Sequence, residues 1–299
     1  MKKITIMILL TFTISAQACE FCGCGVGNFY LGILPQFHRN FVGIRYQVQD
    51  FNSHVGLHPS LATTEHFQST ELWARFYPIP KLQVLTLVAY HFNEQTTTSG
   101  KIYLDGIGDI PVLVNYNLIN TQSNDPEREW NHNVWIGGGV KVPTGKYTFT
   151  DTPTEVANAN FQLGTGSIDF MMNAIYTLRY KKFGVNSDFT YKLNTFNPDR
   201  YKFGNKINGT VSMVFIQQVK KVGLMPNAGV YYEDSGLNKS DDIVISDTGG
   251  SALFATGGLE MYWQKYSLGM NYRKPVEQDL ANGRIKAHER MMVHLTFLF

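Results

Sequence analysis

The side chains with the most reactive chemistry lie close to the N-terminus. Cys19, Cys22 and Cys24 fall within six positions, and they are the only cysteines in the chain. Thiolates this close together can bind a soft cation such as Cu(I), or Zn(II) if a fourth ligand such as His38 joins them. Copper or zinc at this cluster is one hypothesis, although three thiols are one fewer than the usual set of four.

Two other chemistries fit the same cysteines. In an oxidising compartment, two of them would form a disulfide and leave a spare thiol. Alternatively, Cys19 would carry a lipid if it directly follows a lipoprotein cleavage site, where Ala18 fits the preceding position and Gln17 fits poorly. The sequence leaves these three hypotheses open.

The segment before the cysteines indicates export from the cytoplasm. Residues 1–18 begin with a basic pair, continue with an apolar run and end in a small-x-small pattern at Ala16 and Ala18, as a secretory signal peptide does. The mature chain is therefore expected to begin at Cys19. Removing the two leader lysines from 26 basic residues leaves 24, against 24 acidic ones. This balance gives no indication of nucleic-acid binding.

The body of the chain contains histidines but no recognisable nucleophile. His91, His132, His288 and His294 are scattered, and no Gly-x-Ser-x-Gly motif or Ser–His spacing marks a catalytic serine. The glycine-rich run at 137–147 departs from the Walker spacing, and its proline would break the helix that a phosphate-binding loop needs. We therefore expect that the chain is not an enzyme.

Segments of period two make up the rest of the chain. In the last ten residues, Val293 and Leu295 share one face while Arg290 and His294 share the other, and only a strand separates them in this way. The same alternation predicts twelve strands, an even number as single-chain bacterial barrels require. Their predicted ranges are 40–50, 67–77, 81–92, 108–119, 132–142, 167–180, 183–194, 205–218, 222–233, 251–263, 266–274 and 288–299.

The connections between these strands alternate in length. Long polar segments fall at 51–66, 93–107, 143–166, 195–204, 234–250 and 275–287, and short turns separate them, apart from a medium-length turn at 120–131. This asymmetry is typical of a barrel with tight periplasmic turns and longer outer loops. Aromatic residues at the short turns would meet the lipid headgroups; they are Tyr180, Phe183, Trp263 and Tyr266.

These patterns predict an all-β fold. The expected architecture is a transmembrane antiparallel up-and-down β-barrel of about 12 strands over residues 40–299. A Cys-rich segment at 19–39 would precede it and either plug the lumen or lie along the periplasmic rim. Beyond the leader no run approaches the ~18 apolar residues of a spanning helix, so helices are not expected to cross the membrane.

Charged residues of both signs occupy the face of the strands predicted to point inward. They would form a salt-bridge network in a small or plugged lumen, or line a solute pathway and set its selectivity, and the two interpretations are compatible. These candidate lumen residues are Arg45, Glu71, Arg75, His91, Asp109, Lys141, Asp169, Arg179, Asp188, Lys192, Lys206, Glu260, Arg273, Arg290 and His294.

Three motifs resemble those of a known family. Asp105-Gly-Ile-Gly-Asp109, the 137–147 run with its Pro-Thr-Gly, and the 163–169 run Leu-Gly-Thr-Gly-Ser-Ile-Asp are similar, in this order, to motifs of the outer-membrane transporter family linked to meta-pathway phenol degradation. The resemblance covers roughly residues 40–299. It implies an outer-membrane channel or transporter, but it does not imply that phenol is the solute.

The expected function is passive diffusion of an unidentified small solute through a charge-lined lumen in the outer membrane of a Gram-negative bacterium. One alternative is a copper- or zinc-linked binding protein that uses the cysteine cluster, with the barrel as its anchor. An outer-membrane enzyme is the other. The expected partners are outer-membrane lipid, the solute, and the barrel-assembly machinery, which would recognise the C-terminal Phe299. No nucleic-acid partner is expected.

Overall fold

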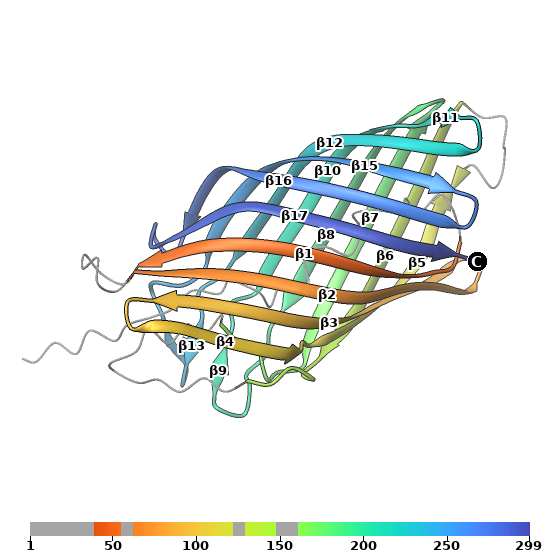
Figure 1. Cartoon of the computed structure of the whole chain (residues 1–299). Coiled ribbons are helices and arrows are strands. Elements are labelled where there is room, and N and C mark those ends of the chain that lie inside the picture. The colour runs from red at the N-terminus through yellow and green to blue at the C-terminus, as the bar shows by residue number, and fades with distance from the viewer. Residues whose placement is uncertain (1–38, 55–61, 122–128, 148–160) are drawn as a thin grey trace, which may run out of the picture.

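The computed structural model describes residues 39–54, 62–121, 129–147 and 161–299. The leader, the three cysteines and His38 lie outside the described residues, and so do the signal-peptide and metal hypotheses that rest on them. The described chain forms antiparallel strands that close into one barrel (Figure 1). In these ranges no helix is long and apolar enough to cross a membrane.

Twelve strands form the barrel wall when β4 is counted with β5 and β11 (Gln217–Val219) with β10, because each short strand continues its neighbour. In order around the wall they are β1 (Phe41–His54), β2 (Ala62–Ile79), β3 (Leu82–Thr97), β4 (Gly100–Ile107) with β5 (Ile110–Asn120), β6 (Trp130–Val142), β7 (Asp169–Tyr180), β8 (Phe183–Leu193), β10 (Lys206–Phe215), β12 (Val222–Ser235), β15 (Gly250–Trp263), β16 (Tyr266–Leu280) and β17 (Ile285–Leu298).

The first and last strands close the barrel. β1 pairs with β17 in antiparallel register, with Phe41 opposite Leu298, and β10 pairs with β12 on the far side. Hydrogen bonds therefore run around the whole wall, which leaves few unpaired backbone groups to meet lipid. The predicted closed antiparallel barrel of about 12 strands is confirmed.

Several strands extend further toward the end of the barrel with the long connections than the alternation predicted. The segment 93–107, predicted as a loop, instead continues β3 to Thr97 and returns as β4, which pairs with β3 from Gly100 to Ile107. Most side chains of β4 are exposed, so this strand lacks the alternation that identifies the others. The predicted loops at 51–66 and 275–287 are likewise partly strand, because β2 begins at Ala62 and β16 extends to Leu280.

The outside of the barrel is apolar. On β17 the exposed Met291, Val293 and Leu295 alternate with the buried Met292 and His294, and large apolar side chains are exposed in the same way on the other strands. A soluble monomer rarely exposes so much contiguous apolar surface, whereas a barrel in lipid requires it. An even number of antiparallel strands with this exterior places the protein in the outer membrane of a Gram-negative bacterium, as predicted.

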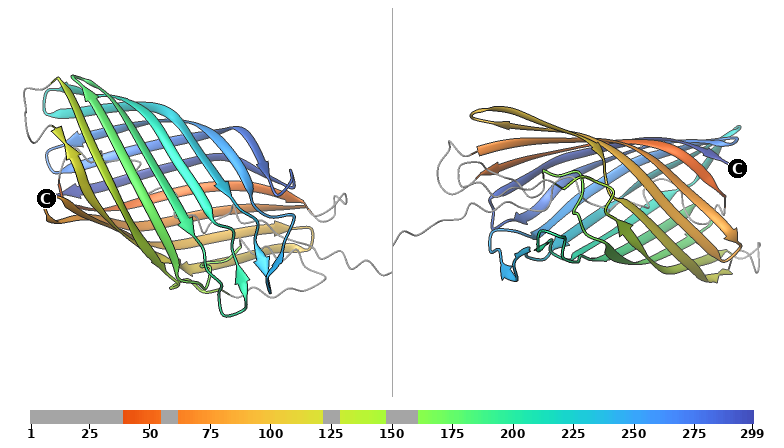
Figure 2. Two further views of the ribbon diagram at one scale, coloured as in Figure 1. Left: turned by 180° about the vertical axis from the view of Figure 1, so that it is seen from behind. Right: turned by 90° about the horizontal axis from the view of Figure 1, so that it is seen from below.

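The two ends of the barrel differ. At the end that carries the C-terminus, tight turns need a left-handed backbone at Lys181, Lys220 and Gln264, each with φ of 53°. Aromatic rings pack beside these turns, with Trp263 and Tyr266 stacked 6.4 Å apart between ring centres. At the opposite end, longer connections carry a small sheet of β9 (Tyr201–Lys202), β13 (Lys239–Ser240) and β14 (Ile243–Val244), as Figures 1 and 2 show.

Candidate functional site

The candidate site is the inner face of the barrel, which every strand supplies through alternate residues. The charged residues predicted there lie on that face. Those that are buried are Arg45, Glu71, Arg75, Lys141, Asp169, Lys192, Glu260, Arg273, Arg290 and His294. Those of intermediate exposure are His91, Asp109, Arg179, Asp188 and Lys206. Their role in transport stays a prediction.

An ion pair and its hydrogen bonds occupy the half of the lumen nearest the short turns, which is the periplasmic half in barrels of this type. Arg45 on β1 pairs with Glu71, its direct neighbour on β2. The same carboxylate accepts hydrogen bonds from Gln47 and from Ser69, the latter at 3.2 Å. Because each charge is buried and paired, this cluster stabilises one geometry of the wall.

A second arginine in this half is held by aromatic rings. The guanidinium carbon of Arg75 lies 4.8 Å from the ring centre of Phe41 and 5.4 Å from that of Tyr77. Its terminal Nη2 also donates a hydrogen bond of 3.2 Å to the backbone oxygen of Arg39. Arg75 therefore fixes the start of β1 at the periplasmic opening.

His294 and Glu260 meet across β16, which separates β15 from β17 on the inner face. The Nε2 of His294 lies 3.2 Å from a carboxylate oxygen of Glu260, and that oxygen accepts a hydrogen bond of 3.1 Å from Ser267. Gly269 on β16 leaves the necessary space, because a Cβ at this position would collide with both Glu260 and His294. Ser267 bonds to the carboxylate rather than to the histidine, so this is not an activated serine nucleophile.

Apolar side chains also form two clusters on the inner face, named here the inner and the outer layer, which the prediction of a charge-lined interior did not include. The inner layer comprises Phe41, Trp73, Leu85, Leu87, Ala89, Leu113, Trp135, Met171, Ile175 and Leu298. The outer layer comprises Phe51, Phe67, Phe161, Tyr231, Ala252, Phe254, Leu280, Ala281, Ile285 and Ala287. Charged side chains lie among these rings, since the guanidinium carbons of Arg45 and Arg290 lie 5.4 Å from the ring centre of Trp73 and 4.2 Å from that of Phe254.

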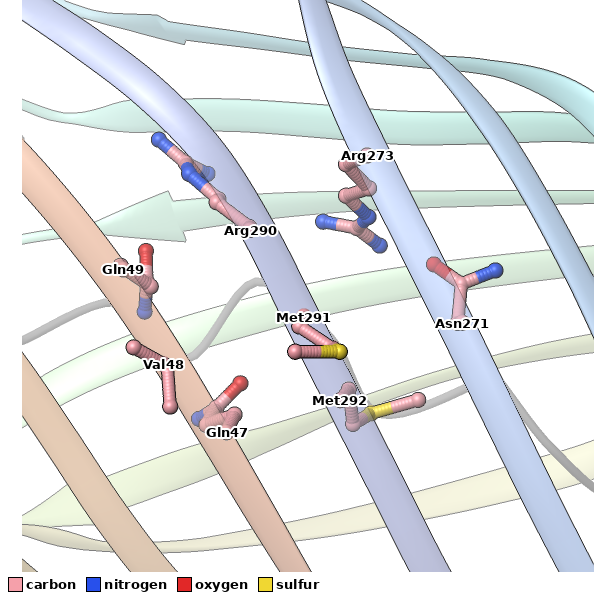
Figure 3. A pocket seen from close by; sticks show the side chains of 8 residues that line it. All are labelled: Gln47, Val48, Gln49, Asn271, Arg273, Arg290, Met291 and Met292. Carbon is pink, nitrogen blue, oxygen red and sulfur yellow. The ribbon is translucent and has the colours of Figure 1, made fainter.

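Two arginines lie beside the outer apolar layer. Arg290 on β17 binds both oxygens of Glu233 on β12, at 2.6 and 3.1 Å. Arg273 on β16 stands directly opposite Arg290 in the strand register, and its guanidinium carbon lies 3.7 Å from the ring centre of Tyr231. Figure 3 shows both guanidinium groups at a small recess that Gln49 of β1 also lines.

At the outer rim, the three family-like motifs meet around one lysine. The amine of Lys141, which precedes the Pro-Thr-Gly of its motif, pairs with Asp109 of the first motif and lies 2.8 Å from Asp169 of the third. The backbone nitrogens of Gly145 and Thr165 donate to the Asp109 carboxylate at 3.0 and 2.9 Å. The rim cluster, Asp109, Lys141, Thr165 and Asp169, therefore holds the connection after β6 against the start of β7.

Some lumen residues were absent from the prediction. Glu233 was missed although it shares a face with Tyr231, because it stood at the end of the predicted strand 222–233. Glu65 was missed because it fell in the predicted loop 51–66; it is fully buried and accepts hydrogen bonds from Ser53 and Gln95 at 2.9 and 3.2 Å. Continuing the alternation outward would have placed both carboxylates on the inner face.

The metal hypothesis is not addressed by the described part of the chain. Cys19, Cys22, Cys24 and His38 lie outside it. Among the described residues there is no group of three or more His, Cys, Asp or Glu side chains that could hold a metal ion.

Comparison with known proteins gives matches at the level of structure. No protein-family model matches the sequence, and no curated protein does. The crystal structure of the COG4313 outer membrane channel from Pseudomonas putida F1 is similar over 92% of this chain and 100% of that chain, with 15% identity and a TM-score of 0.63. The β domain of the Bordetella autotransporter BrkA is similar over 87% of this chain and 100% of that chain, with 9% identity and a TM-score of 0.54. These likenesses show a shared barrel fold, the fold that the resemblance to the transporter family implied.

Proposed function

We propose that this protein is an outer-membrane channel through which a small solute diffuses passively. The observation that carries the proposal is the contrast between the two faces of the wall. Apolar residues such as Leu295 face lipid, whereas ionised or polar residues such as Arg290 and Glu233 face inward. A barrel that served only as an anchor would not need buried charges, because a packed apolar interior would stabilise it as well.

The arrangement of the inner face supports passage of a solute with both polar and apolar parts. Paired charges lie among aromatic rings on the inner face, so neither a purely hydrophilic nor a purely apolar molecule is matched along its whole length. Selectivity would come from these charges and from the width of the lumen beside them. The proposal involves no covalent step, and the Ser267–Glu260–His294 geometry supports none.

The similarity to a channel from Pseudomonas putida F1 agrees with this proposal at the level of fold. No solute is transferred from that protein to this one. The motif resemblance to transporters linked to phenol degradation gives the same class of function without naming the molecule.

Liposome swelling with a panel of solutes tests the proposal. The full chain would be refolded into liposomes and challenged with neutral sugars, small aromatic alcohols and small carboxylates of graded size. A channel gives swelling rates that fall with solute size and differ with solute charge. Liposomes that contain the folded barrel and swell no faster than empty ones with every solute would overturn it.

A further inference from the structure

Arg273 is a buried cation of the lumen with unused hydrogen-bonding capacity. Its side chain is 3% exposed, and neither terminal nitrogen makes a hydrogen bond. A guanidinium carries five N–H donors, and leaving donors buried without acceptors costs free energy. The ring of Tyr231, 3.7 Å from the guanidinium carbon, attracts the positive charge but accepts no conventional hydrogen bond.

The carboxylates close to Arg273 are already committed elsewhere. Glu233 gives both oxygens to Arg290 and also accepts a hydrogen bond of 2.8 Å from the hydroxyl of Tyr231. Asp188 acts on Arg273 through its charge, but its side chain is hydrogen-bonded to Thr210. Arg273 therefore has neighbouring negative charge without a hydrogen-bonded partner.

The strand register raises the free-energy cost of burying Arg273 without a hydrogen-bonded partner. Arg273 and Arg290 are direct partners across the β16–β17 pair, and like charges in that position repel each other. Arg290 is neutralised by Glu233, whereas Arg273 is not paired in this way. An anion held at Arg273 would remove both the repulsion and the unused donors.

The residues around Arg273 indicate which other chemical groups a bound anion would have. The recess at Arg273 and Arg290 is also lined by Gln49, whose amide can donate hydrogen bonds, and by Asn271, whose amide nitrogen already donates to Thr256 at 3.0 Å. Beside it stands the outer apolar layer, in which Phe254 lies 5.9 Å from Tyr231 between ring centres. The recess itself has a volume of only about 10 Å³, but the chemistry of its two walls favours a ligand with a planar anionic head and an apolar body.

From this geometry we infer that Arg273 is a binding site, within the lumen, for the carboxylate of a solute with an aromatic or other apolar body. The carboxylate accepts the parallel N–H donors of the guanidinium, as carboxylates do in two-pronged pairs with arginine. The apolar body would displace the side chains that now cover Tyr231, Phe254 and Phe51, which are 0–2% exposed. This inference deepens the proposed channel function, since it names the chemical class of the solute.

Calorimetric titration of the refolded full chain in detergent tests the site without requiring an open pore. The probes are benzoate, benzyl alcohol, acetate and inorganic phosphate, in a buffer low in chloride. Benzoate is expected to bind more tightly than the other three, because it alone has both the planar anion and the ring. Equal binding of benzoate, acetate and phosphate would overturn the apolar half of the inference.

Variants isolate the role of Arg273. Arg273→Met is expected to weaken benzoate binding at least tenfold. Arg273→Lys is expected to bind benzoate with intermediate affinity, because lysine keeps the positive charge but lacks the parallel N–H donors of the guanidinium. Lys274→Met removes a positive charge from the next residue of the same strand, which is exposed on the other face, and should bind benzoate as the unaltered protein does. Folding of each variant is verified by the heat-dependent shift of the barrel in gel electrophoresis.

The possible results test the proposed binding site independently of the proposed channel function. If Arg273→Met folds and binds benzoate as tightly as the unaltered protein, the site is wrong, even where liposome swelling demonstrates a channel. If benzoate binding depends on Arg273 while no solute enters liposomes, the site stands and the channel proposal fails.

Discussion

Arg290 and Glu233 form a two-pronged ion pair between strands that are not neighbours in the barrel wall. The Nη2 and Nη1 atoms of Arg290 on β17 lie 2.6 and 3.1 Å from the two oxygens of Glu233 on β12, and β16 and β15 stand between these strands. The pair therefore spans the curved inner face rather than following the hydrogen-bond ladder. The ion pair therefore contributes both to the stability of the wall and to the charge of the lumen.

Glu233→Gln should both destabilise the barrel and change its ion selectivity. Removing one partner of a buried ion pair leaves an uncompensated charge, at a cost of about 3–5 kcal/mol. Urea titration should show this loss, and the reversal potential in a salt gradient should shift toward anions. Glu94→Gln is the control, since Glu94 pairs with Lys101 on an exposed hairpin, and it should leave both measurements unchanged. A reversal potential equal to that of the unaltered protein would remove Glu233 from the permeation path.

Lys141→Met should loosen the outer rim. Without the amine, the carboxylates of Asp109 and Asp169 face each other unpaired, and the expected cost is again about 3–5 kcal/mol. Hydrogen exchange at residues 161–169 should become faster, while exchange in β16 and β17 should not change. Adding Asp169→Asn should restore part of the protection, because it removes one of the two repelling charges. The exposed Lys146→Met is the control. Unaltered exchange in Lys141→Met would show that the motifs are held together by other contacts.

Gly139→Ala should weaken the pairing of β5 with β6. A Cβ at Gly139 would collide with the backbone oxygen of Val112 and lie 2.8 Å from the Cα of Leu113, so the strands must move apart. Overpacking of this kind costs about 1–3 kcal/mol. Gly257→Ala is the matched control, since the nearest atom to its added Cβ is 3.9 Å away. Equal yields of folded barrel from the two variants would contradict this explanation of the glycine.

Deletion of Phe299 should reduce assembly more than stability. The backbone nitrogen of Phe299 donates to the oxygen of Asn40 at 3.0 Å, and its ring lies 6.0 Å from that of Phe297. These are modest contacts at the end of the closing strand. We expect less folded barrel in the membrane of growing cells but nearly unchanged refolding of the purified chain into detergent. An equal loss in both settings would indicate a structural role in place of recognition by the assembly machinery.

The barrel wall could be predicted from sequence because each strand carries its own signal. On β17 the alternation of Met291, Val293 and Leu295 with Arg290 and His294 is fixed by lipid on one side and the lumen on the other, and the structure reproduces it. β4 could not be predicted in this way. It forms the outer end of the β4–β5 wall strand with most of its side chains exposed, so neither face selects apolar residues.

The partners inside the lumen could not be predicted, because they depend on barrel closure and register. Nothing near residue 290 in the sequence points to Glu233, and nothing near Lys141 shows that Asp109 and Asp169 will reach it together. The direct pair of Arg45 with Glu71 needs only the β1–β2 hairpin register. Contacts between distant strands require the tilt and stagger of the whole barrel.

Single-channel recording in planar bilayers measures ion passage through the lumen itself. Purified full chain, shown to be folded by its electrophoretic shift, would be inserted into a bilayer separating two potassium chloride solutions. A channel through the charged lumen predicts discrete conductance steps with a defined reversal potential, and benzoate should interrupt the current in a manner that depends on Arg273. Repeated insertion of folded barrel without any conductance step would show that the barrel is not a channel.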